Sequence, residues 1–438
     1  MRKKLSSICD KHIFGKRKHM KDLFSLPESS FPAHFIWGSA TAGHQIEGDN
    51  IHSQWWAWEQ AGRFAERSGK ACNSYALYKE DISLLQELGH QAYRFSIEWS
   101  RIEPAENQFD TEALAHYVDL ARRVKEAGMK TFVTLHHFSH PQWFEEQGAF
   151  HTLDNLPFFE RYVRYVVPAL APYTDFWIII NEFNLGNAPE RLLEKANFIR
   201  YHARGYHLVK EYSTAPVSSA HAFPYYMPSR PTSDFDVTLT RYRDWIDHEF
   251  FFHAIRTGEI VMPFQDVVFD ADVKGTCDYW AINYYTRHMI DARRASGEGT
   301  RYRHTQLKLI PMDFYLEEFF PEGIILNLER LIDKPVYITE NGVASNDDAW
   351  RLVYLALHMT ALKEAIDRGV DVRGYLYWSF LDNYEWGSFL PRFGLVDVDF
   401  TTFTRSPRPS AYFYRDVIEH NGFTPEMLRH YLPWLAEL

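Results

Sequence analysis

The chain has 438 residues, of which 46% are hydrophobic and 24% are charged, as in an ordinary folded globular protein. Its formal net charge of −11 at pH 7 argues against a nucleic-acid partner, because phosphates are attracted by broad basic surfaces. No run approaches about 18 consecutive apolar residues, so the sequence predicts no membrane-spanning helix.

Three cysteines, Cys9, Cys72 and Cys277, lie far apart in the chain. An odd number at this spacing predicts neither a disulfide framework nor a zinc site. Free thiols are typical of a reducing compartment, and we therefore expect a cytoplasmic protein.

Residues 1–22 carry eight Lys or Arg and two Asp, unlike the acidic remainder. They lack the apolar core of roughly 7–15 residues that a signal peptide requires. We expect residues 1–30 to form a basic, disordered extension and residues 31–438 to form the folded domain. A weak targeting or surface-tethering role and a misassigned start codon are the alternatives.

The rest of the chain alternates between two kinds of segment. Short runs rich in β-branched and aromatic residues are typical of strands, and segments with helical periodicity lie between many of them. The eight expected strands span residues 35–41, 93–99, 131–137, 176–182, 217–223, 279–285, 336–340 and 374–380.

Three of the helical segments have clear ends. Residues 73–88, 111–127 and 348–368 place apolar side chains on one face, and a glycine follows each of them. Asn73 or Ser74 is the expected N-cap of the first.

Strands that alternate with helices favour parallel pairing, and eight such units predict an α/β fold, a single (β/α)8 TIM barrel. The alternative is an open doubly wound sheet, but that class usually carries a glycine-rich phosphate loop after its first strand. Here the first strand runs into GSATAGHQIEG, which lacks GxGxxG. The barrel is therefore favoured.

Seven of the eight expected strands carry polar residues at or just beyond their carboxyl ends. In a barrel these ends converge on one mouth, where active sites are built. The residues are Gln45 and Glu47, Arg94 and Glu98, His136 and His137, Asn181 and Glu182, Asn283 and Tyr285, Glu340 and Asn341, and Trp378 with the following Glu385 and Trp386.

Two of these carboxylates, Glu182 and Glu340, follow apolar strands and are each next to an Asn. A salt bridge would explain either one alone, but two in one cleft suit cleavage of a glycosidic bond. One group then protonates the leaving oxygen while the other attacks the anomeric carbon. Their surroundings must separate their pKa values, and Arg94 is placed to keep one of them ionised.

The stretch LHHFSH raises the alternative of a metal site. Adjacent residues of a strand point to opposite faces, so His136 and His137 cannot easily share one ion. Binding of a sugar hydroxyl or simple packing explains them better. A serine nucleophile has no GxSxG motif to support it.

Seven segments, in order, resemble the motifs of glycoside hydrolase family 1, the retaining β-glucosidases and their relatives. The resemblance runs from residue 31 to about residue 414. The segments are FIWGSATAGHQIEG, YRFSIEWSRIEP, TLHHFSHPQWF, INEFN, INYYT, YITENG and YWSFLDNYEWGSFLPRFGLVDVDF.

The resemblance implies a retaining exo-β-glycosidase, most simply a β-glucosidase, that needs no metal or organic cofactor. It implies small β-glycosides or short β-linked oligosaccharides as substrates. Glu182 would be the acid/base and Glu340 the nucleophile, about 5–5.5 Å apart, with Arg94 and Tyr285 supporting the nucleophile. The implied sugar-binding residues are Gln45, His137, Asn181, Asn283, Trp378, Glu385, Trp386 and Phe393.

Three departures from the family pattern are visible. Phe183 stands where the family has Pro, residues 385–393 are about one residue short, and the whole chain is compact. We expect Phe183 to leave the backbone after the acid freer and to add bulk beside the site. We expect trimmed loops to open the leaving-group side.

Other activities on the same scaffold are a transglycosylase, a 6-phospho-β-glycosidase, a thioglucosidase and an inactive sugar-binding barrel. The thioglucosidase branch has Gln in place of Glu182, and the 6-phospho branch usually has Ser and Lys around Glu385. An inactive relative would tend to lose a catalytic Glu, and both are present. The sequence sets neither the sugar epimer nor the oligomeric state.

Overall fold

The computed structural model describes residues 24, 28–186, 189–295 and 319–433. Most of the extension expected over residues 1–30 lies outside these ranges. Its last two residues form β1 (Ser29–Ser30), which pairs antiparallel with β16 (Gly422–Phe423) beside the C-terminal helix α16 (Pro425–Tyr431).

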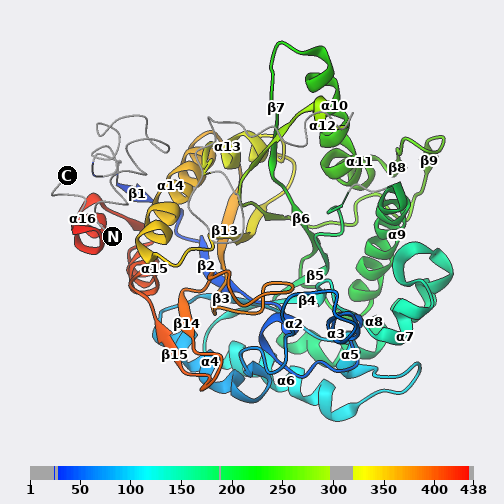
Figure 1. The fold of residues 1–438 in the computed structure, drawn as a ribbon, viewed down its shortest axis with the longest axis horizontal. Coiled ribbons are helices and arrows are strands. Elements are labelled where there is room, and N and C mark those ends of the chain that lie inside the picture. The colour runs from blue at the N-terminus through cyan, green and yellow to red at the C-terminus, as the bar shows by residue number, and fades with distance from the viewer. Residues whose placement is uncertain (1–23, 25–27, 187–188, 296–318, 434–438) are drawn as a thin grey trace.

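Eight parallel strands close into a barrel in the order β10-β12-β13-β2-β3-β4-β5-β6, surrounded by helices (Figure 1). The predicted (β/α)8 barrel is confirmed, and each expected strand overlaps one barrel strand. The barrel strands are β2 (Ile36–Ala40), β3 (Ala92–Ser96), β4 (Lys130–His136), β5 (Phe176–Asn181), β6 (Val217–Ala222), β10 (Trp280–Asn283), β12 (Val336–Asn341) and β13 (Val372–Trp378).

Short strands decorate the barrel in pairs. Strands β7 and β11 pair in parallel; β7 follows barrel strand β6 in the chain, and β11 follows barrel strand β10. The short strands are β7 (Tyr225–Pro228), β8 (Glu259–Ile260), β9 (Val268–Phe269), β11 (Arg287–Ile290), β14 (Val396–Val398) and β15 (Arg405–Pro407).

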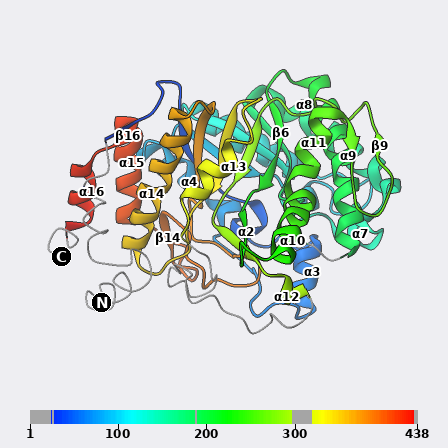
Figure 2. The same cartoon turned by 90° about the horizontal axis from the view of Figure 1, so that it is seen from above.

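Helices cover the outside of the barrel, with α14 and α15 on one side and α9 and α11 on the other (Figures 1 and 2). The longer helices are α4 (Ser74–Glu87), α6 (Thr111–Glu126), α8 (Leu156–Leu170), α9 (Pro189–Tyr212), α10 (Asp234–Asp244), α11 (Phe250–Thr257), α14 (Asp348–Asp367) and α15 (Pro409–His420). The shorter ones are α2 (Gly43–Ile46), α3 (Gln54–Gln60), α5 (Trp99–Ile102), α7 (Gln142–Glu146), α12 (Ala292–Ala295) and α13 (Glu322–Leu328), with a π-helical turn over Trp245–Glu249 and 3-10 turns over Ala149–His151, Leu153–Asn155 and Ala171–Tyr173.

The three helices predicted with clear ends are present within a residue at each end. Gly89, Gly128 and Gly369 follow them with φ of 70°, 83° and 97°, the left-handed conformation that ends a helix. Asn73 precedes α4 as expected, but its side chain makes no capping bond because the residue is itself left-handed at φ 55°.

Strand β5 shows how the sequence builds the wall of the barrel. Ile178, Ile179 and Ile180 are all fully buried, because alternate side chains face the barrel interior and the surrounding helices. Ile179 packs against α9, where a Cβ added to Gly205 would lie 2.6 Å from its Cγ2. None of the described helices is long and apolar enough to cross a bilayer.

Truncating Ile179 tests this wall. Ile179→Ala should lower the free energy of unfolding by about 2–5 kcal/mol, because α9 cannot close fully over the cavity. Ile332→Ala is the matched control, since Ile332 is 74% exposed, and should cost less than about 0.5 kcal/mol. Unfolding in guanidinium chloride measures both, and equal losses would contradict the packing described.

Candidate active site

Glu340 lies near the end of β12, where both of its carboxylate oxygens accept hydrogen bonds. Arg94 of β3 donates Nη1–H to Oε1 at 2.7 Å, and the hydroxyl of Tyr285, just beyond β10, donates to Oε2 at 2.7 Å. The Arg94 and Glu340 side chains are 0% and 5% exposed. A charged and a neutral donor on one carboxylate favour its ionised form.

The guanidinium of Arg94 is fixed by three further acceptors. Its Nε donates to the hydroxyl of Thr134 at 3.2 Å, its Nη1 to the carbonyl of Thr339 at 3.1 Å, and its Nη2 to Oδ1 of Asn181 at 2.6 Å. Because a buried guanidinium needs its donors satisfied, these contacts hold its charge beside Glu340.

Glu182 follows β5, and its carboxyl contacts a neutral amide. Nδ2 of Asn283 donates to Oε1 of Glu182 at 2.9 Å and to Oδ1 of Asn181 at 3.1 Å. The hydroxyl of Thr339 donates to Oδ1 of Asn283 at 2.6 Å, which fixes the end of the amide that faces Glu182. One network thus holds two carboxyl groups in different surroundings.

These surroundings separate the two carboxyls in acidity. Burial and the nearby charge of Glu340 raise the pKa of Glu182 from 4.5 to about 8, while Asn283 and Arg94 oppose the rise. Burial also raises the pKa of Glu340, but there the opposing groups are Arg94 and Tyr285. Two buried carboxylates that repel one another do not both ionise easily. The guanidinium therefore favours the negative charge on Glu340 and the proton on Glu182.

The hydrogen bonds around His137 define its tautomer. Oδ1 of Asn181 accepts from Arg94 and Asn283, so Nδ2 of Asn181 must donate to Nε2 of His137, 3.1 Å away. Burial keeps the pKa of His137 well below its usual range, so the ring is neutral. Its Nδ1 therefore carries a proton, and this buried atom has no partner among the described residues.

Gln45 and Glu385 form a second polar group at the mouth. Nε2 of Gln45 donates to Oε2 of Glu385 and to Oδ1 of Asn383, each at 3.0 Å. Its own Oε1 is buried and meets no donor in the described part of the chain. Since buried polar atoms are normally hydrogen-bonded, Gln45 Oε1 and His137 Nδ1 indicate that a polar ligand binds here.

Aromatic rings pack beside these polar groups. The ring of His137 stacks at 5.7 Å from Trp378 and 6.0 Å from Trp386, at interplanar angles of 18° and 17°. Trp386 is supported in turn by Trp55 at 4.7 Å and Phe138 at 5.1 Å. Flat faces next to hydrogen-bonding groups suit a ligand that has both apolar faces and hydroxyl edges.

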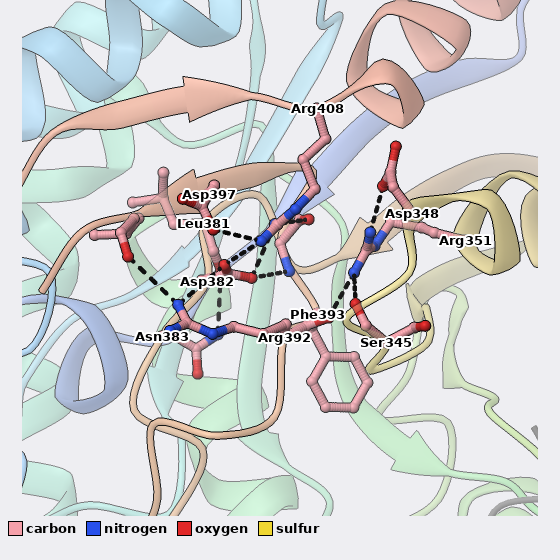
Figure 3. Close-up of polar contacts among 12 residues, drawn as sticks. Ser345, Asp348, Arg351, Leu381, Asp382, Asn383, Arg392, Phe393, Asp397 and Arg408 are labelled. Carbon is pink, nitrogen blue, oxygen red and sulfur yellow. Dashed lines mark hydrogen bonds and ion pairs between the residues drawn. The ribbon is translucent and has the colours of Figure 1, made fainter. Parts of the chain in front are cut away.

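The loop 382–394, which carries Glu385 and Trp386, is tied down at its base by Asp382 (Figure 3). Arg408 donates to both oxygens of this buried carboxylate at 2.6 and 3.1 Å, and Arg392 donates at 3.3 Å. The backbone N–H of Gly394 adds a bond of 2.8 Å. Phe393 points its ring away from these charges, and its centroid lies 6.1 Å from Tyr285.

A family model described as Glycosyl hydrolase family 1 matches residues 27–423. The chain belongs to this family. Both the resemblance read from the motifs and the expected retaining exo-glycosidase activity are therefore confirmed.

Its curated relatives cover nearly the whole chain. The β-galactosidase of Sulfolobus acidocaldarius is 29% identical over 92% of this chain and 97% of its own length. β-Glucosidase A of Thermotoga maritima is 28% identical over 90% and 98%. Both kinds of glycosidase thus lie at similar distances.

Solved structures agree with this relationship. A β-glycosidase from Pyrococcus horikoshii superposes with a TM-score of 0.82 at 34% identity, covering 92% of this chain and 98% of that one. The family 1 β-glucosidase from Thermotoga maritima in complex with isofagomine lactam gives 0.82 at 27% identity, covering 91% and 100%.

The residues singled out from the family resemblance lie together. One hydrogen-bond network contains Arg94, His137, Asn181, Glu182, Asn283, Tyr285 and Glu340. A second contains Gln45 and Glu385, while Trp378, Trp386 and Phe393 contribute rings beside these networks.

Two carboxylates predicted at the mouth have other partners. Glu47 binds Arg101 at 2.7 Å and the hydroxyl of Tyr117. Glu98 accepts bonds from Asn50 at 2.8 Å and Ser139 at 2.6 Å. Both tie loops to the barrel and stay outside the network of the carboxylate pair.

His136 and His137 do point to opposite sides, as the strand geometry predicts. Nε2 of His136 lies 3.3 Å from Nδ1 of His140, whose Nε2 contacts Glu145 at 3.0 Å. In the described part of the chain, no group of three or more His, Cys, Asp or Glu is placed to hold a metal ion.

Several residues that shape the site were missed from the sequence. Thr339 orients both Arg94 and Asn283, and Asn383 contacts Gln45. Their only signal is adjacency to the carboxylates, in YITEN and DNYEW. Asp382, in the same segment, holds the loop at its base.

Phe183 does not add bulk beside the site. Its ring is 2% exposed and packs in an aromatic cluster with Phe198 of α9 at 5.5 Å and Phe251 of α11 at 5.0 Å. The earlier expectation for the bulk of this side chain is therefore wrong, because the backbone turns the ring outward to the helices.

Removing the charge of Glu340 should lower the pKa of Glu182. In Glu340→Gln it should fall from about 8 but stay above 4.5, because burial, the larger cause, remains. Carbon-13 NMR of labelled Glu carboxyls follows the titration. Glu385→Gln is the control and should give a smaller fall, since Glu385 contributes less. An unchanged pKa in Glu340→Gln would contradict the coupling.

Proposed function

We propose that Glu340 is the nucleophile and Glu182 the acid/base of this glycosidase. The observation that carries the proposal is the asymmetry between them: Arg94 and Tyr285 donate to Glu340, and a neutral Asn283 amide donates to Glu182. A nucleophile must be ionised while the acid holds its proton, and these contacts favour that division.

In the proposed first step, an oxygen of Glu340 forms a bond to the anomeric carbon as the glycosidic C–O bond breaks. Glu182 gives its proton to the departing oxygen. In the second step Glu182, now ionised, takes a proton from water, whose oxygen displaces Glu340 from the sugar. Activity should weaken as pH rises through the pKa of Glu182, since the acid is then lost.

The proposed sugar-binding roles follow from buried polar atoms that have no hydrogen-bond partner among the described residues. His137 Nδ1–H is a donor and Gln45 Oε1 an acceptor for sugar hydroxyls, and Glu385 receives hydroxyls beside Gln45. Trp378 and Trp386 supply faces for the apolar side of the ring. Asn181, Asn283 and Phe393 complete the proposed set of substrate-binding residues.

We propose β-glucosides and β-galactosides as substrates, because curated relatives with both names match the chain. Glu385 beside the distal hydroxyls disfavours a 6-phosphorylated sugar through repulsion of like charges. We also propose a cytoplasmic, reducing location, supported by the free, buried Cys72 and Cys277.

Substitution of the two carboxylates tests the mechanism. Glu340→Gln should lower kcat for an aryl β-glucoside by on the order of 10⁴-fold or more, because attack is lost. Glu182→Ala should be rescued by azide on a substrate with a good leaving group, giving the β-glycosyl azide by NMR. Glu211→Gln, an exposed surface Glu, is the control and should keep full activity. Equal rates in Glu340→Gln and the native enzyme would refute the assignment.

A panel of aryl β-glycosides tests the sugar preference. The gluco and galacto substrates should both be hydrolysed, since a carboxylate accepts hydroxyls in either configuration. The 6-phospho-β-glucoside should be at least about 100-fold poorer in kcat/KM, and Glu385→Gln should narrow that gap by removing the repulsion. A native preference for the phosphorylated sugar would overturn the role given to Glu385.

A further inference from the structure

The backbone of Glu182 has an unusual conformation. Its φ is +47°, in the left-handed region that residues other than glycine rarely adopt. Such conformations persist where the surrounding structure determines them, and they cluster at functional sites. Its N–H donates to the carbonyl of Ala220 in β6 at 2.8 Å, and its carbonyl accepts from the N–H of Leu185 at 3.2 Å.

The next residue, Phe183, anchors this turn to the outer helices. Besides Phe198 and Phe251, its ring contacts Phe250 at 6.1 Å and His221 at 6.4 Å. The anchor is apolar and lies on the far side of the backbone from the carboxylate pair.

Asn184 provides a second anchor. Its side-chain amide makes the two hydrogen bonds to β6 that the backbone of another strand residue would otherwise make. Its side-chain amide donates to the carbonyl of Ala222 at 2.7 Å and accepts from the N–H of Ala222 at 3.1 Å. The side chain thereby continues the pairing of β5 with β6 beyond the left-handed residue. Asn184 is 2% exposed, so losing these bonds would leave buried groups unpaired.

The same amide also reaches the π-helical turn Trp245–Glu249. Nδ2 of Asn184 donates to the carbonyl of Asp247 at 2.8 Å. The Asp247 carboxylate is held in turn by Lys195 at 2.5 Å, Arg243 at 2.7 Å and the hydroxyl of Tyr226 at 2.9 Å. The outer end of this anchor is therefore itself fixed.

We propose that Phe183 and Asn184 are positioning residues that hold the Glu182 carboxyl at the leaving oxygen. This inference rests on the proposed acid role of Glu182. The contacts of Phe183 and Asn184 fix the backbone immediately after Glu182 against the outer helices and β6. With the backbone fixed there, Glu182 keeps its left-handed conformation, and its side chain points inward to Asn283. Loosening either anchor lets the turn relax and moves the proton away from the bond that breaks.

The test uses the dependence of kcat/KM on the leaving group. Departure of 2,4-dinitrophenol needs little protonation, whereas departure of phenol needs the acid. Phe183→Ala and Asn184→Ala should therefore lower kcat/KM for phenyl β-glucoside about 10- to 100-fold more than for the dinitrophenyl substrate. Phe183→Leu, which keeps an apolar anchor, should restore most of the native ratio.

Matched controls separate positioning from stability. Phe413→Ala removes a buried ring from α15, on the opposite side of the barrel. Asn197→Ala removes an amide that donates to the carbonyls of Phe150 and His151 at 3.1 and 2.8 Å. Both should lower the melting temperature and leave the ratio between the two substrates unchanged.

The experiment distinguishes failure of the positioning inference from failure of the proposed acid role of Glu182. Glu182→Ala should show the largest discrimination between the substrates; if it shows none, the proposed acid role fails. If Glu182→Ala discriminates and the Phe183 and Asn184 variants lose activity equally on both substrates, only the positioning inference is overturned. Should the alanine variants not fold, Phe183→Val and Asn184→Ser are judged by the same ratio.

Discussion

The buried ion pair between Arg94 and Glu340 is the constraint on which the site depends. A carboxylate that is 5% exposed inside a barrel is costly unless a fixed cation and further donors replace its water. Arg94 meets this need only because Thr134, Thr339 and Asn181 occupy its other donors. The guanidinium of Arg94 on β3 thus joins three further strands, β4, β5 and β12.

The same network also favours the protonated form of the second carboxyl, Glu182. Once the negative charge is fixed on Glu340, a neighbouring buried carboxyl is most stable with its proton. Asn181 and Asn283 transmit this asymmetry, since each amide has one end taken by Arg94 or Thr339. The tautomer of His137 follows from the same chain of donors.

Much of this arrangement could be predicted from the sequence, for identifiable reasons. Strand runs and terminal glycines are local signals, and the convergence of strand ends makes Glu182 and Glu340 neighbours despite their separation in the chain. The partners of Asp382, Arg392 and Arg408 could not be predicted, because buried ion pairs between loops leave no periodic trace. The direction of Phe183 escaped prediction since it depends on the left-handed turn at Glu182.

Two parts of the fold hold the charged groups of the site. The carboxylate pair sits on barrel strands or the residue beyond them, where neighbouring ladders leave little freedom, whereas Glu385 and Trp386 belong to a loop held by Asp382 at its base. If Glu385 and Trp386 bind the sugar as proposed, a change in that loop alters which hydroxyls are bound and leaves the contact between Arg94 and Glu340 in place. Relatives named for different sugars lie at similar distances from this chain, as expected if specificity varies in such loops while the strand ends stay fixed. On the proposed roles, a change in this loop bears first on sugar recognition, whereas the division of charge between Glu182 and Glu340 is a property of the barrel strands.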